Sequence, residues 1–158
     1  MTSLVSPVPG AGVGSPVTLI WIDARQAVVA RWGEGAARLD RVAGDLPPHE
    51  RSLGHVKHNP LIRQGGGQLQ TRLDHRRHEA EHAYIDAVLV HVPDEGYVEV
   101  IGPGPMRHHL VSRLLRRERP GAARVVRTQA ADQMTDAQVA ARLRELAGHP
   151  PARRAVSR

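Results

Sequence analysis

The residues best suited to chemistry in this 158-residue chain are three consecutive glycines followed by a glutamine, Gly65 to Gln68. Without Cβ atoms, the backbone there can adopt positive φ and approach a flat partner closely. Gln68 offers one carbonyl acceptor and two amide donors without a charge. Because an amide cannot act as a general base at neutral pH, its chemistry is limited to positioning a reactant and stabilising developing charge. We therefore predict a functional tip formed by Gly66, Gly67 and Gln68.

Cationic side chains flank this tip. Of the 22 basic residues all but Lys57 are arginine, and the formal net charge is +6. Arginine binds phosphate through a planar, bidentate guanidinium and also stacks on bases, so the excess favours a nucleic-acid partner over diffuse attraction to a membrane. The alternative is that it only reflects the base composition of the genome. The candidate RNA contacts are Arg63, Gly65, Arg72, His75 and Arg76.

A second constellation, His78-Glu79-Ala80-Glu81-His82, reads as H-E-x-x-H. On a helix the two histidines share a face and could bind zinc, while the glutamate activates a zinc-bound water. A third protein ligand would be required, for which the candidates are Glu99, His108 and His109. The polar neighbours of the motif argue against a core zinc helix, so we expect no metal and no other cofactor and keep the zinc hydrolase as an alternative.

Two further features have competing interpretations. Gly102-Pro103-Gly104 precedes a predicted helix and is either a turn or a phosphate contact at the helix N-terminus. The basic face from Arg107 to Arg119 is either exposed to solvent or binds an RNA backbone.

Composition bounds the class of protein. With 158 residues, 41% of them hydrophobic, the chain is long enough for one core and too short for two. The absence of cysteine excludes disulfides and thiolate chemistry. There is no apolar run of membrane-spanning length and no signal-peptide pattern, so a cytoplasmic protein is expected.

The elements that must position the tip follow from periodicity and turn signals. Residues 1–15 are expected to be a disordered leader, 16–147 a single domain with the glycine loop at about 44–68, and 148–158 a basic tail. We predict strands at 17–23, 26–32, 36–42, 97–101 and 124–128, and helices at about 69–90, 106–119 and 135–147, the last with Thr135 and Gln138 as a capping box. This order predicts an α/β domain with a mixed sheet of about five strands and helices packed on it.

The long predicted helix after the tip changes character along its length. Its apolar stripe is interrupted where Arg76 and Arg77 replace core residues, and resumes from Ala80. We infer that the first half projects from the body while the second half packs on the sheet.

These residues resemble the central domain of archaeal and eukaryotic peptide-release factors, in particular their small bacterial relatives. In that family a Gly-Gly-Gln loop precedes a long, arginine-rich helix containing His-x-Tyr. The resemblance spans about Pro16 to Ala147. The matching residues are Gly66, Gly67, Gln68, Arg72, His82, Tyr84 and Val88, with Trp21-Ile22-Asp23, Ile101-Gly102-Pro103-Gly104 and Thr135-Asp136-Ala137-Gln138.

The resemblance implies a fold of the release-factor central-domain type, with a ribonuclease H-like motif. It also implies a peptidyl-tRNA hydrolase acting on the large ribosomal subunit, with rRNA and peptidyl-tRNA as partners. Gly66, Gly67 and Gln68 would place water against the ester, and RNA 2′-hydroxyls would transfer the proton. Because no codon-reading or partner-binding domain is recognised, ribosome rescue is expected rather than stop-codon reading. A non-catalytic ribosome-binding or hibernation-type factor is the alternative.

Overall fold

A five-stranded mixed sheet forms the centre of the protein, described by a computed structural model for residues 15–47, 66–118 and 124–148. The elements are β1 (Val17–Ile22), β2 (Gln26–Gly33), β3 (Ala36–Ala43), α1 (Gly66–Leu89), β4 (Gly96–Gly102), α2 (Met106–Arg116), β5 (Arg124–Ala130) and α3 (Asp136–Leu146). The strand order is β3-β2-β1-β4-β5, antiparallel from β3 to β1 and parallel from β1 to β5. The predicted α/β class with a mixed sheet is confirmed.

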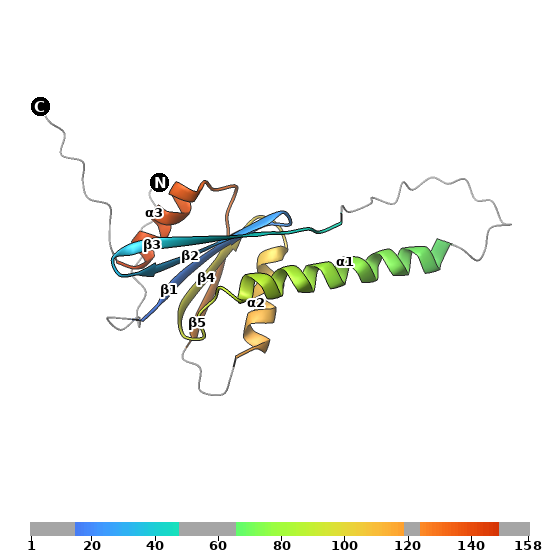
Figure 1. Cartoon of the computed structure of the whole chain (residues 1–158), viewed down its shortest axis with the longest axis horizontal. Coiled ribbons are helices and arrows are strands. Elements are labelled where there is room, and N and C mark those ends of the chain that lie inside the picture. Colours follow the sequence, from blue (N-terminus) through green and yellow to red (C-terminus); the bar gives the residue numbers. More distant parts are fainter. Residues whose placement is uncertain (1–14, 48–65, 119–123, 149–158) are drawn as a thin grey trace, which may run out of the picture.

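The central strand β1 is buried along its whole length because helices cover both faces of the sheet (Figure 1). Ile20 and Ile22 pack with α1 and α2, whereas Leu19 and Trp21 face α3. This explains why the strand is a continuous apolar run without alternation. The indole Nε1 of Trp21 donates a hydrogen bond of 2.9 Å to the carbonyl of Asp132, which satisfies the one polar atom of the side chain.

The predicted boundaries differ from the observed ones by more than one residue at three ends. Helix α1 begins at Gly66 and not near Leu69, so the glycine-glutamine tip forms the first helical turn and not the end of a loop. Glycine lowers helix propensity, but the first-turn N–H groups need no intrahelical acceptor, so a helix can begin there. Helix α2 ends at Arg116 and not near Arg119, and β5 continues to Ala130 through its parallel pairing with β4.

Several predictions concern residues outside the described ranges. They are the disordered leader over residues 1–14, the loop over 48–65 with its RNA contacts Arg63 and Gly65, and the basic tail over 149–158. Within the described ranges, no helix is both long and apolar enough to cross a membrane.

Helix α1 has two halves with different environments, as predicted. Tyr84, Ile85, Val88 and Leu89 are buried against the sheet. From Gln70 to Glu79 only Arg77 is even partly buried, and this half extends away from the sheet (Figure 1). The second half of α1 therefore anchors the first half, which carries Gly66 to Gln68 at its far end.

We expect Gly102→Ala to lower the free energy of unfolding by about 2 to 4 kcal/mol. The added methyl group would clash with a neighbouring strand, and alanine would be strained at the positive φ that glycine adopts there. Gly102 has φ +147°, and a Cβ atom there would lie 2.0 Å from the carbonyl oxygen of Ile22. Urea unfolding followed by tryptophan fluorescence measures the effect. Gly33→Ala is the matched control, since its Cβ would meet nothing within 4 Å. Equal midpoints for the two variants would contradict this assignment.

Candidate functional site

The Gly66-Gly67-Gln68 backbone forms the N-terminal turn of α1. The first four N–H groups of an α-helix have no intrahelical acceptor, and the helix dipole makes this end electropositive. The first turn contains no acidic residue that would neutralise it. Backbone N–H groups at an electropositive helix end favour an electronegative group.

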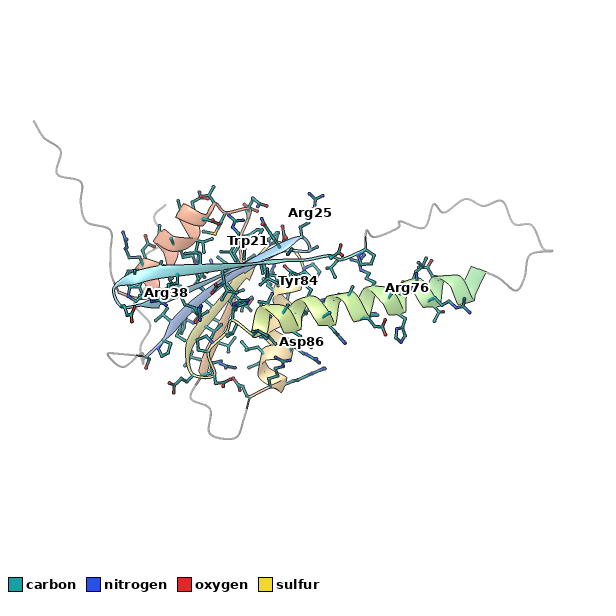
Figure 2. The ribbon with its side chains drawn as sticks, in the orientation of Figure 1. Trp21, Arg25, Arg38, Arg76, Tyr84 and Asp86 are labelled. Atoms are coloured by element: carbon teal, nitrogen blue, oxygen red, sulfur yellow. The ribbon has the colours of Figure 1, made fainter. Side chains whose placement is uncertain are left out.

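The predicted cationic residues Arg72 and Arg76 follow this tip on the projecting half, one helical turn apart. Both are exposed, and neither forms an ion pair with another described residue. Figure 2 shows Arg76 on the projecting half of α1. His75 lies 3.4 Å from the carboxylate of Glu79, measured between Nδ1 and Oε1. Three of the five predicted RNA contacts thus share one projecting helix with the tip.

An ion-pair cluster that sequence reasoning missed joins α1 to α2. The Asp86 carboxylate accepts two hydrogen bonds of 3.1 Å from Arg113 and one of 2.9 Å from Arg117. The hydrogen bond from Arg113 is the main reason that the pKa of Asp86 lies below its ordinary value. One turn nearer the tip, His109 Nδ1 lies 2.5 Å from Glu81 Oε1. These contacts fix the direction of α1 beside α2.

Tyr84, which the family resemblance includes, has a structural role. Its ring is buried, on the opposite flank of α1 from Asp86 (Figure 2). Its hydroxyl donates a 3.1 Å hydrogen bond to the carbonyl of Asp23, at the end of β1. Burial, followed by the nearby Asp23 carboxylate, raises the pKa of the phenol well above its ordinary value. Tyr84 therefore ties α1 to the sheet as a neutral hydrogen-bond donor.

In the described part of the chain, no third protein ligand for zinc lies beside the H-E-x-x-H segment. Glu81 is engaged by His109, and Glu99 lies on the opposite face of the sheet, where Arg142 donates hydrogen bonds of 3.0 and 3.3 Å to it. No three histidine or carboxylate side chains among the described residues are arranged to hold a metal ion. The zinc-hydrolase alternative thus has no ligand set in these ranges.

The Gly102-Pro103-Gly104 segment forms the turn that leads into α2. The guanidinium of Arg107 closes it, with hydrogen bonds of 3.0 Å to the carbonyl of Gly102 and 2.8 Å to that of Gly104. Among the described residues, no side chain caps the N-terminus of α2. Arg107, which the sequence left open between a solvated exterior and an RNA contact, therefore supports the turn.

Comparisons with known proteins find only distant similarity. No family model matches the sequence, and no curated protein matches it. The structure is similar to that of an archaeal translation termination factor, aRF1, with 14% identity and a TM-score of 0.37, over 84% of this chain and 34% of that one. It is also similar to a structure described as an archaeal protein, with 18% identity and a TM-score of 0.29, over 72% of this chain and 30% of that one. The chain spans about a third of the length of these two proteins.

We expect Asp86→Asn to destabilise the protein at neutral pH by at most about 1 kcal/mol, because solvent screens a carboxylate that is 37% exposed. The folded pKa of Asp86 lies below its unfolded value, so its stabilising effect is complete above the unfolded pKa, near 4, and is lost as the pH falls through the folded pKa. The difference between variant and parent should therefore vanish in acid. Urea unfolding at a series of pH values measures it.

Asp45→Asn is the control, since the exposed Asp45 forms no ion pair with a described residue. A difference between Asp86→Asn and the parent that stayed constant down to the lowest pH would contradict the role of the ionised carboxylate.

Proposed function

We propose that the chain is a ribosome-directed peptidyl-tRNA hydrolase that releases peptides from stalled ribosomes. The observation that carries this proposal is the position of Gly66, Gly67 and Gln68 at the far end of the projecting half of α1. A narrow helix that extends beyond its own domain is suited to entering a site built by another molecule. The tip supplies donors but no general base, so the remaining groups must come from that site.

The reaction is the hydrolysis of the ester between the peptide and the terminal ribose of tRNA. A water oxygen forms a bond to the ester carbonyl carbon, the bond from that carbon to the ribose oxygen breaks, and a proton passes to the ribose oxygen. The Gln68 side chain would orient the water, and backbone N–H groups of the tip would stabilise the carbonyl oxygen as it gains negative charge. Ribosomal RNA hydroxyls would carry the proton, so the chain needs no cofactor of its own.

The positive charge of the projecting half supports binding to a site lined by RNA. Arg72 and Arg76 are free of ion pairs with described residues, and the whole chain has a net charge of +6. Unpaired guanidinium groups can bind phosphates while the tip is held between RNA walls. Since the target is the ribosome, the site of action would be the cytoplasm.

We expect Gln68→Ala to slow peptide release about 10²-fold, the usual cost of removing one group that positions or stabilises a reacting centre. The assay measures release of labelled peptide from stalled ribosome complexes in a single turnover. Gln133→Ala is the control, because Gln133 is an exposed glutamine outside α1, in the segment between β5 and α3. Release by Gln68→Ala at the parental rate would overturn the mechanism.

The same assay tests the non-catalytic alternative. Parent protein that cosediments with large subunits and leaves the ester intact would identify a ribosome-binding factor and overturn the hydrolase proposal. Cleavage of free peptidyl-tRNA at the ribosome-bound rate would also overturn it, since a self-contained site would then exist.

We expect Arg72→Glu and Arg76→Glu each to weaken binding to large ribosomal subunits, and to reduce the slope of log affinity against log salt by about 1, as the loss of one phosphate contact does. Cosedimentation across a salt series measures both effects. Arg144→Glu is the charge-matched control, because Arg144 is exposed on α3, on the opposite face of the sheet. An equal loss of affinity with Arg144→Glu would contradict the prediction, because it would show that binding depends on net charge alone.

A further inference from the structure

A cavity of about 580 Å³ lies at the base of the projecting half of α1. It is open to solvent on one side and is lined by one side of α1, by the turn between β1 and β2, and by the loop from β4 into α2. The volume is within the range of small-molecule sites, about 300 to 1,000 Å³. Of the ion-pair cluster between α1 and α2, Glu81 and His109 line this cavity, whereas Asp86, Arg113 and Arg117 do not.

The cavity occupies a special position in the sheet. Strands β1 and β4 are parallel neighbours, and the chain leaves their carboxyl ends in opposite directions, toward β2 on one side and toward α2 and β5 on the other. In open α/β sheets, ligands bind at the carboxyl ends of the strands, in the crevice where helical crossovers lead to opposite sides. The position here is analogous, although the connection from β1 to β2 is a hairpin. Ala24 follows β1, Pro103 and Pro105 follow β4, and all three line the cavity.

The wall formed by these residues and Met106 is largely apolar and suits a flat ring. Of the three carboxylates in the lining, two already have strong partners. Asp23 Oδ1 accepts backbone N–H groups at 2.7 and 2.8 Å, and Glu81 pairs with His109 at 2.5 Å. Within the described part of the chain, Asp74 accepts a single long bond, 3.3 Å from the amide of Gln70. Asp74 is therefore the acceptor with capacity left for an amino group.

Anion-binding groups lie in the same cavity. Arg77 uses one N–H in a long, 3.3 Å hydrogen bond to the carbonyl of Pro47, and its other four guanidinium N–H groups have no acceptor among the described residues. Pro105 and Met106 bring the N-terminus of the 11-residue helix α2 to the cavity, and no side chain of the described ranges caps it. Helix N-termini and arginine both favour phosphate.

We propose that this cavity binds one unstacked nucleotide of a single-stranded RNA segment. The base lies against Pro103, Pro105 and Met106, its exocyclic amino group donates to Asp74, and its phosphate binds Arg77 and the N-terminus of α2. This inference rests on the proposed function for its RNA partner. Asp74 lies about 9 Å along the helix from Gln68, at 1.5 Å per residue, so the bound nucleotide belongs to RNA close to the tip.

The first test uses the methionine methyl groups as probes in the intact protein. With methyl-labelled methionine, addition of a short single-stranded RNA should shift the NMR signal of Met106, which lines the cavity. The signal of Met134 should stay in place, because Met134 packs with α3 on the opposite face of the sheet. An unmoved Met106 signal at saturating RNA, or equal shifts of both signals, would overturn the proposal.

The second test measures affinity for homopolymeric RNA hexamers. Asp74→Ala should reduce affinity for oligo-A and oligo-C about tenfold and leave oligo-U, which has no exocyclic amino group, within twofold. Arg77→Gln should weaken all three at least tenfold, and Arg144→Glu should retain the base preference of the parent. Equal losses on all bases with Asp74→Ala would overturn the base contact.

Two further measurements distinguish RNA binding in the cavity from the peptide-release activity proposed above. Gln68→Ala should lose release activity and keep the RNA-induced shift of Met106, so failure of one assay leaves the other interpretable. Free nucleoside monophosphates should shift Met106 only weakly. A shift with a monophosphate and none with the hexamer would assign the cavity to a free nucleotide and overturn the RNA proposal.

Discussion

The burial of the second half of α1 against the sheet is the constraint on which the rest of the structure depends. Four side chains, Tyr84, Ile85, Val88 and Leu89, attach a 24-residue helix to the domain, and the residues before them have almost no core of their own. Burying each such side chain contributes about 1.5 to 3 kcal/mol. The direction of the tip, the position of the cavity and the display of Arg72 and Arg76 all follow from this attachment.

Polar contacts add orientation to that apolar attachment. Asp86 joins two arginines of α2, Glu81 joins His109, and the Tyr84 hydroxyl reaches the end of β1. Partly exposed ion pairs contribute little to stability, but several around one helix select a single direction among those that apolar packing permits. The helix therefore works as a rigid support near the sheet, where its charged residues are committed to internal partners. Farther out, the arginines are available to other molecules.

Much of this arrangement could be predicted from the sequence because its signals are local. The apolar run of β1, the capping box of Thr135 and Gln138 and the loss of apolar periodicity at Arg76 and Arg77 each depend on neighbouring residues, and the structure bears out all three. The Asp86 cluster could not be found in this way, since it depends on how α1 crosses α2. The cavity likewise arises where two loops distant in sequence meet. The start of α1 was misplaced because glycine propensity is a weak guide at a helix end, where backbone N–H groups are free in any case.

The exposed half of α1 also has a consequence for local stability. Isolated helices shorter than about 12 to 15 residues are only marginally stable in water, and from Gln70 to Glu79 almost no tertiary packing supplements the backbone hydrogen bonds. Amide hydrogen exchange should therefore become steadily faster from Val88 outward, with the slowest exchange at the sheet and fraying toward the glycines. Any receptor that grips the outer turns must then supply part of the free energy that keeps them helical, which couples the shape of the tip to its surroundings.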